Sequence, residues 1–333
     1  MSDSGDRKIL GVFADRGVRG ICLGVPESEN IGLVVRFIDE WLAPRKCNLL
    51  VLLTRYAYKF ESHPECASAK AVSKEDMIQI REACKRNGIK LVPKMNLLGH
   101  QSGTTRDRMD GLLQGHPEFD ETPAMDEVFY CRSLCPNHPD IKPVVFDLMD
   151  ELIDVCEADA IHIGCDEVFD LGLCDRCKDK STADIFADWV NSLAGHLRAN
   201  GKRTYMWGDR LLPADSTGYG FWEASANGTE GAIDKIDKDV MICDWHYEDM
   251  EKFASVDIFS EHGLDFLVCP WRYQANAAKF LKYADEHANE HLKGFLATTW
   301  QGSAPIVKHI LGVEKSDNDT TIKLSATLEA LFS

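Results

Sequence analysis

Short, continuously apolar runs alternate with longer amphipathic segments along most of this chain. Because the runs are apolar at nearly every position, they predict strands that are buried on both faces, as in a parallel sheet covered by helices. Eight such strands are expected, at Arg19–Val25, Asn48–Thr54, Ile89–Asn96, Ala160–Glu167, Arg203–Asp209, Val240–Tyr247, Asp265–Arg272 and Gly294–Trp300.

The segments between these runs carry apolar residues at helical spacing. Ser73–Gly88 is the clearest, with a serine cap, early acids, late bases and a closing glycine. The other expected helices are Asn30–Lys46, His138–Glu157, Ala183–Gly201, a weaker one at Gly228–Asp237, Ser255–Gly263, Asn276–Asn289 and a final region from Pro305.

This order of elements predicts an α/β protein built as a single (β/α)8 TIM barrel over residues 9–333, after a disordered tail at residues 1–8. A doubly wound open sheet is the rival architecture. It is disfavoured because the first run is not followed by the glycine-rich turn that cradles a dinucleotide. We therefore expect no cofactor.

Composition narrows the set of partners. The formal net charge of −17 disfavours binding to nucleic acid or to an anionic membrane surface. The amino terminus has no signal-peptide pattern, and no apolar stretch is long enough to span a bilayer, so we expect a cytoplasmic protein. Several of the 12 cysteines lie in apolar runs and are expected to be buried reduced thiols. A homodimer is left open.

Polar and aromatic residues collect where the predicted strands end, which is where barrel enzymes place their active sites. Four of the seven tryptophans stand there, and a fifth, Trp222, follows the fifth strand. Flat aromatic faces beside acids and amides suit a sugar ring. The strand-end candidates are Asn96, His100, Asp166, Glu167, Trp207, Asp209, Trp245, Tyr247, Trp271 and Trp300.

The most informative strand end is IHIGCDEVFDLG, where an apolar run stops at two adjacent acids, Asp166 and Glu167. Glycoside hydrolysis needs one acid to protonate the leaving oxygen and a second negative group. Adjacent strand residues point to opposite faces, so the pair cannot readily flank a glycosidic bond. If both act, the second acid is expected to orient a nucleophile that the substrate supplies. A solvated strand end without a role is the alternative.

These residues resemble a known family. HIGCDE, His162 to Glu167, resembles the His-x-Gly-Gly-Asp-Glu signature of glycoside hydrolase family 20, the β-N-acetylhexosaminidases, with Cys165 in place of the second glycine. VRGICLGV resembles the first-strand segment that carries a sugar-binding arginine, here Arg19. LVPKMNLLGH and TTW resemble the third-strand and last-strand segments of the family.

The resemblance implies a carbohydrate substrate, a terminal β-linked GlcNAc or GalNAc that is released with retention by substrate-assisted catalysis. Glu167 would be the general acid and then the base, and Asp166 would position the substrate's acetamido group. Tyr247 would assist that group, His100 and His162 would support the acids, and tryptophans would line the sugar pocket, namely Trp207, Trp222 and Trp300, with Trp245 as a further candidate.

Departures from the family pattern keep other functions open. Lys94, Asn96 and Leu98 replace the family's Glu, Asp and Pro, and TTWQGS lacks the acid that usually follows the last-strand tryptophan. A carbohydrate-binding protein on an inactivated barrel, and a retaining glycosidase for sugars without an acetamido group, are the alternatives. A metal-dependent amidohydrolase is disfavoured because the first strand lacks a His-x-His pair.

Two cysteine pairs raise the question of a metal. Cys131 and Cys135 lie in the long loop before the fourth strand, and Cys174 and Cys177 follow the acids in CDRC. Four thiols in neighbouring loops can bind zinc, but the spacing between the pairs is not that of a recognised finger, so unligated thiols are favoured. His63, His116 and His138 stand beside prolines and are expected at the surface or in turns.

Overall fold

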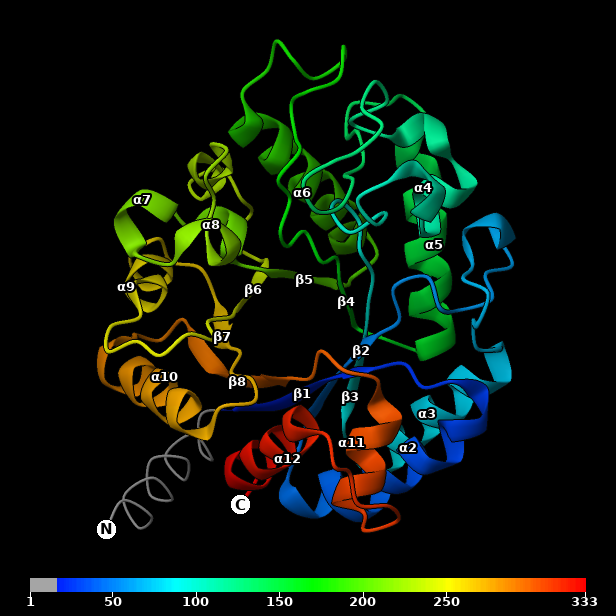
Figure 1. Ribbon diagram of the computed structural model, residues 1–333, viewed down its shortest axis with the longest axis vertical. Coiled ribbons are helices and arrows are strands. Elements are labelled where there is room, and N and C mark those ends of the chain that lie inside the picture. The colour runs from blue at the N-terminus through cyan, green and yellow to red at the C-terminus, as the bar shows by residue number, and fades with distance from the viewer. Residues whose placement is uncertain (1–16) are drawn as a thin grey trace. The chain divides into compact units, whose positions relative to one another are not determined.

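The computed structural model describes residues 17–333, and in them eight parallel strands form a closed barrel in sequence order (Figure 1). The predicted TIM barrel is thereby confirmed, whereas the expected tail at residues 1–8 lies outside the described residues. The strands are β1 (Val18–Gly24), β2 (Leu49–Leu53), β3 (Lys90–Lys94), β4 (Ala160–His162), β5 (Arg203–Trp207), β6 (Met241–Asp244), β7 (Phe266–Val268) and β8 (Leu292–Thr298).

Most predicted amphipathic segments form helices, although Asn30–Lys46 is α-helical only at Ile31–Phe37, and three short helices were not predicted. The helices are α2 (Ile31–Phe37), α3 (Lys74–Arg86), α4 (Gly111–Gly115), α5 (Ile141–Cys156), α6 (Thr182–Ala199), α7 (Ala214–Thr217), α8 (Gly220–Glu223), α9 (Ala254–Glu261), α10 (Gln274–His287), α11 (Ser303–Ile310) and α12 (Asp319–Leu331). The capping box expected at the start of α3 is present, because Ser73 and Asp76 each accept a hydrogen bond from the other's backbone N–H.

The described residues divide into two compact units. One comprises the residues up to Leu53, Val72–Pro93 and Cys243–Ser333. Within it β1 pairs with β2 and β8, and β8 also pairs with β7. Its helices pack in the order α9, α10, α12, α11, α2 and α3, and Figure 1 shows the carboxyl-terminal pair α11 and α12 in orange and red.

The second unit comprises Thr54–Ala71 and Lys94–Ile242. Here β4 pairs with β5 and with Lys94 at the end of β3, while α5 packs on β4 and α6 packs on β5. The long loop between β3 and α5 contains α4 and folds on itself through isolated bridges such as Asp120 to Leu134. In the chain this loop is followed by α5, by β4 and then by the two acids.

Several predicted boundaries are off by a few residues, and two of the differences bear on the site or change an element. β4 ends at His162, five residues before the expected end at Glu167, because the backbone then enters positive φ at Gly164, Cys165 and Glu167. The weak helix at Gly228–Asp237 is reduced to a 3-10 turn at Thr229–Ala232. Its two glycines lower helix propensity, and Gly228 has φ of 90°.

Burial agrees with the expected state of the thiols. All 12 cysteines lie in the described part of the chain, all are buried, and none is in a disulfide. Among the described helices, none has the length and apolar character needed to cross a bilayer.

Candidate active site

The two acids sit on a tight turn at Gly164–Glu167, here called the acid turn, and not on the strand itself. After His162 the backbone φ is 77° at Gly164, 67° at Cys165 and 49° at Glu167. At Gly164 a Cβ atom would lie 2.7 Å from the carbonyl oxygen of Met95, so a side chain does not fit there. Because the chain leaves the strand at this turn, the expectation that Asp166 and Glu167 point to opposite faces is wrong.

Both carboxylates instead approach the same ring nitrogen of His100. His100 Nε2 lies 3.1 Å from Asp166 Oδ2 and 3.2 Å from Glu167 Oε2. Gly99 allows this approach, since a Cβ there would be 2.8 Å from the carbonyl oxygen of Asp166. Burial opposes the charged imidazole, but the Asp166 carboxylate outweighs it and raises the pKa of His100 well above its usual value. His100 is therefore the imidazolium between the two acids.

A buried lysine supplies a second positive charge to Asp166. Lys94 Nζ lies 3.8 Å from Asp166 Oδ1 and donates a hydrogen bond to Asn96 Oδ1, and the lysine side chain is 1% exposed. Burial would raise the pKa of Asp166, but Lys94 and then His100 outweigh it, so this pKa is held far below its usual range. Asp166 is therefore a carboxylate at neutral pH.

From the sequence Lys94 was only a departure from the family pattern, and its pairing with Asp166 was not expected. A signal was available, because a lysine that closes an apolar strand needs a buried partner. Asn96, an expected substrate-binding residue, lies beside Lys94. Its side chain receives the Lys94 hydrogen bond, and its carbonyl oxygen accepts hydrogen bonds from Tyr56 Oη and Gln101 Nε2, both at 2.5 Å.

Asp209 holds the acid turn from the side of β5. Its Oδ2 accepts hydrogen bonds from the backbone N–H of Glu167 at 2.9 Å and from Arg210 Nε at 2.7 Å. Burial raises the pKa of Asp209 to about 6 against the opposing effect of Arg210. Because its carboxylate oxygen is used to hold Glu167, Asp209 positions the acid turn.

His162 and Trp207 pack against each other, and His162 contacts the acid turn. Their ring centroids are 4.5 Å apart, and His162 Nδ1 accepts a hydrogen bond from the backbone N–H of Gly164 at 3.1 Å. Burial and then the nearby Lys94 charge lower the pKa of His162 well below its usual value, so the ring is neutral. Trp207 was expected to line the sugar pocket. It is instead 0% exposed and packs on His162, so it does not present a face to a ligand.

An exposed group of five aromatic rings, here called the aromatic patch, borders the acids. Its members are Phe129, Tyr130, Phe169, Phe221 and Trp222, with neighbouring ring centroids 5.0–6.0 Å apart. The Tyr130 ring also lies 5.6 Å from His100, and Trp222 is 39% exposed. Of the five, only Trp222 was expected, since Phe129, Tyr130 and Phe169 lie in loops and Phe221 lies in the short helix α8, all without strand-end spacing.

The other unit brings together four of the expected residues at the ends of β6, β7 and β8. Trp300 Nε1 donates a hydrogen bond to the Tyr247 hydroxyl at 2.7 Å, and that hydroxyl lies 3.1 Å from Thr298 Oγ1. The Tyr247 ring is 5.1 Å from Trp245 and 5.2 Å from Trp271, centroid to centroid. These contacts orient the Tyr247 hydroxyl.

The position of Arg19 does not support a sugar-binding role. Arg19 is the second residue of β1, at the amino-terminal end of that strand, and is 6% exposed. Its guanidinium packs between the Phe295 and Phe332 rings and donates weakly to the carbonyl oxygens of Arg45 and Leu331, both at 3.5 Å. This arginine therefore joins helix ends to the start of the barrel.

Three groups in the described part of the chain have the composition of metal ligands. They are His100 with Asp166 and Glu167, His63 with Glu65 and His116, and Glu121 with Cys135, Cys174 and Cys177. Cys131, expected with the other thiols, lies apart from them, and its sulfur accepts a hydrogen bond from the backbone N–H of His100 at 3.3 Å. His138, expected at the surface or in a turn, is buried against Phe119.

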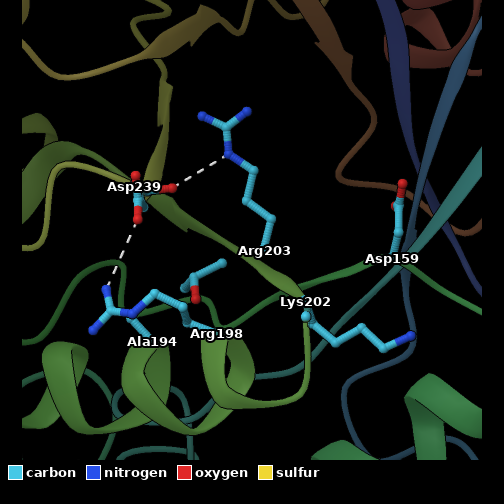
Figure 2. Close-up of a pocket in the computed structure, with 8 residues that line it drawn as sticks. Asp159, Ala194, Arg198, Lys202, Arg203 and Asp239 are labelled. Carbon is cyan, nitrogen blue, oxygen red and sulfur yellow. Dashed lines mark hydrogen bonds and ion pairs between the residues drawn. The ribbon is translucent and has the colours of Figure 1, made fainter.

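A pocket of about 350 Å³ lies at the opposite, amino-terminal end of β5. Figure 2 shows Asp239 between Arg198 and Arg203 in its wall, and the Arg198 guanidinium is 3.9 Å from the Asp239 carboxylate. Since Arg203 is the first residue of β5 and the acids follow the end of β4, this pocket is separate from the acid turn.

Comparison with known proteins identifies the family. Residues 47–306 match the family described as glycosyl hydrolase family 20, catalytic domain. No curated protein matches the sequence. The Flavobacterium johnsoniae chitobiase is similar in structure, with a TM-score of 0.67 and 18% identity over 94% of this chain and 50% of that one.

Two further structures are similar. The β-N-acetylhexosaminidase from Bacteroides fragilis has a TM-score of 0.64 and 15% identity, over 95% of this chain and 64% of that one. Dispersin B has a TM-score of 0.56 and 16% identity, over 94% of this chain and 98% of that one. The chain thus spans half to two thirds of the first two proteins. Because the family match covers most of its length, the chain belongs to glycosyl hydrolase family 20.

Proposed function

We propose that the protein is an exo-acting β-N-acetylhexosaminidase that hydrolyses terminal β-linked GlcNAc or GalNAc with retention. The observation that carries the proposal is the convergence of Asp166 and Glu167 on His100, with their oxygens within 4.8 Å of one another. Retaining enzymes with a carboxylate nucleophile hold their acids about 5–5.5 Å apart on either side of the bond. Because Asp166 and Glu167 share one imidazole and do not stand on opposite sides of a sugar site, their arrangement favours a nucleophile that the substrate supplies.

The charge on Asp166 supports a division of labour between the two acids. Lys94 and His100 keep Asp166 ionised, so its carboxylate can accept the acetamido N–H and stabilise the positive charge that develops on that group. Glu167 is more exposed and donates its proton to the glycosidic oxygen as the bond to the anomeric carbon breaks.

The proposed reaction has two steps. The acetamido carbonyl oxygen forms a bond to the anomeric carbon, and the leaving group departs with the Glu167 proton. Water then attacks the anomeric carbon of the resulting oxazolinium ion and gives up a proton to Glu167. The bond from that carbon to the acetamido oxygen breaks, which restores the acetamido group and gives the retained sugar. We propose Tyr247 as the hydroxyl that assists the acetamido group, since Trp300 and Thr298 orient it.

The aromatic patch supports a leaving group with an apolar face. Tyr130 contacts His100, and the patch extends outward from there to Phe129 and Trp222. Aromatic faces pack well on the C–H faces of a second sugar or on an apolar aglycone. We assign the patch to the part of the substrate beyond the scissile bond.

A panel of aryl glycosides tests the proposal. We expect release of nitrophenol from the N-acetyl-β-D-glucosaminide or galactosaminide and little from the plain glucoside or galactoside. Turnover of the plain glycosides would instead identify a retaining glycosidase that needs no acetamido group. No turnover of any substrate by folded protein, together with calorimetric binding of plain sugar but not of a thiazoline inhibitor, would identify a carbohydrate-binding protein.

A further inference from the structure

Four buried side chains beside the acid turn meet with the composition of a metal site. Cys135 Sγ lies 3.4 Å from Cys174 Sγ and 3.7 Å from Cys177 Sγ. Glu121 contributes a carboxylate oxygen, and the four ligand atoms all lie within 4.8 Å of one another. They come from the long loop before α5 and from the CDRC turn that follows Glu167.

The CDRC turn aims its two thiols at the same point. The backbone N–H groups of Cys177 and Lys178 both donate to the carbonyl oxygen of Cys174 at 2.9 Å, which closes a tight turn. Asn137 Nδ2 lies 3.1 Å from Cys177 Sγ as a hydrogen-bond donor. Donors of this kind hold metal-bound thiolates in place.

Glu121 is the independent indication of a cation. It is 0% exposed, and its Oε1 accepts hydrogen bonds from the backbone N–H groups of Leu173 at 2.8 Å and Cys174 at 3.3 Å. Its Oε2 is buried and has no hydrogen-bond partner among the described residues. A carboxylate oxygen left in this state is costly unless a cation pairs with it.

The distances favour a metal over a disulfide. A disulfide needs sulfur atoms about 2.05 Å apart, whereas Cys135 stands at 3.4 and 3.7 Å from its neighbours. Zn–S bonds of about 2.3 Å in a tetrahedron place the sulfurs about 3.8 Å apart. Thiolates select zinc over magnesium or calcium, which prefer oxygen ligands.

We propose that Glu121, Cys135, Cys174 and Cys177 bind one Zn²⁺ ion in a closed, four-coordinate structural site. Three thiols lose their protons to the buffer as the ion binds. The ion joins the long loop, which carries His100 and the aromatic residues Phe129 and Tyr130, to the turn that follows the acids. The site is independent of the proposed enzymatic function, because metal binding is measured without substrate.

Metal content of the purified protein tests the site directly. The chain is expressed without a polyhistidine tag in zinc-containing medium, and metals are measured by inductively coupled plasma mass spectrometry after gel filtration. We expect about one zinc per chain. Displacement with a mercurial in the presence of a zinc dye should release it, and cobalt exchange should give the absorption bands of tetrahedral cobalt thiolate.

Substitutions separate the four ligands from their neighbours. We expect Cys174→Ser and Cys177→Ser to lose the metal, and Glu121→Gln to bind zinc at least about tenfold more weakly. Cys131→Ser is the matched control, because Cys131 lies in the same loop and contacts His100 instead. It should retain the zinc of the wild type.

Wild-type protein that is folded, fully reduced and free of zinc, with no zinc uptake on addition, would overturn the proposal even if every variant failed to fold. A disulfide between two of the three thiols, found by mass spectrometry of protein purified anaerobically, would also overturn it. Loss of zinc from Cys131→Ser with retention in Glu121→Gln would exclude Glu121 as a ligand.

Discussion

The ammonium of Lys94 lies 3.8 Å from the carboxylate of Asp166, and both side chains are buried. Removing one partner from a buried ion pair strands the other charge in a poorly solvated position. The pair therefore has consequences for stability as well as for the charge of the candidate site.

Replacing Lys94 by methionine keeps the length of the side chain and removes the charge. We expect the free energy of unfolding to fall by about 3–5 kcal/mol, since Asp166 would keep only His100 as a cation. Urea unfolding at pH 7 measures the change. Lys90→Met, at the exposed start of the same strand, is the control and should change stability by about 0.5 kcal/mol or less. Equal effects of the two substitutions would contradict the role of the pair.

His100→Gln should lower stability in a pH-dependent way. The pKa of His100 is raised in the folded protein. Its contribution is therefore fully present below the unfolded pKa of about 6.5 and is lost as the pH rises through the higher folded pKa. Below pH 6.5 we expect the free energy of unfolding of the variant to be about 1.5–3 kcal/mol lower than that of the wild type, and we expect this difference to shrink at alkaline pH. Urea unfolding of both proteins across pH measures it, and a difference that is constant with pH would refute the imidazolium.

Glu167→Gln tests the proton donor. We expect kcat to fall by about 10²–10⁴ for aryl N-acetylhexosaminides with poor leaving groups. A dinitrophenyl leaving group departs without protonation, so its release in the first step should be affected much less. Rates with phenyl, nitrophenyl and dinitrophenyl substrates measure this dependence. The same loss for all three substrates would mean that Glu167 has another role.

Trp222→Ala tests the aromatic patch. Because Trp222 is partly exposed, its loss should change stability little, whereas KM should rise about tenfold for substrates with an aromatic leaving group. The methyl glycoside of the same sugar is the control, since its leaving group is too small to reach the patch. An equal rise in KM for both substrates would place Trp222 against the sugar itself.

Substitutions at Cys165 test the acid turn. Cys165 is buried and has φ of 67°, a conformation that glycine adopts freely and that β-branched residues avoid. We expect Cys165→Gly to change the free energy of unfolding by less than about 1 kcal/mol, because relief of strain offsets the lost packing. Cys165→Val should cost about 1–3 kcal/mol. Thermal and urea unfolding compare the two, and a more stable valine variant would contradict the role of the backbone.

Much of the fold could be predicted because eight apolar runs and their intervening helices leave few parallel architectures. The expectation that active-site residues follow the strand ends also identified Asp166, Glu167 and His100, which the structure brings together. It identified Tyr247 and Trp300 as well, which form a hydrogen bond. The early end of β4 was not predictable, since positive φ at Cys165 and Glu167 depends on contacts with the preceding loop, where Gly99 meets the Asp166 carbonyl.

Other parts of the site depend on contacts between residues far apart in sequence. Lys94 is recognisable only once Asp166 is placed beside it. Glu121 stands 14 residues before Cys135 with no spacing that marks a ligand, so the thiol pairs alone suggested Cys131 instead. Phe129 lies in a loop and Phe221 in the four-residue helix α8, where the hydrophobic pattern carries no information on which side chains will meet.

The short β4 strand also matters for protein engineering. Sheet pairing of β4 ends at His162, and the acid turn is then held by a backbone hydrogen bond from Trp207 N to the Gly164 carbonyl oxygen at 3.0 Å and by side chains. Asp209 is bonded to Glu167 N, and Asn227 Nδ2 lies 2.9 Å from the carbonyl oxygens of Val168 and Phe169. The segment from Gly164 to Phe169 is thus a module that is attached to the barrel by a few identifiable bonds. A chimaera that transplants it together with Lys94, His100, Asp209 and Asn227 would carry the charge arrangement of the acids into another barrel.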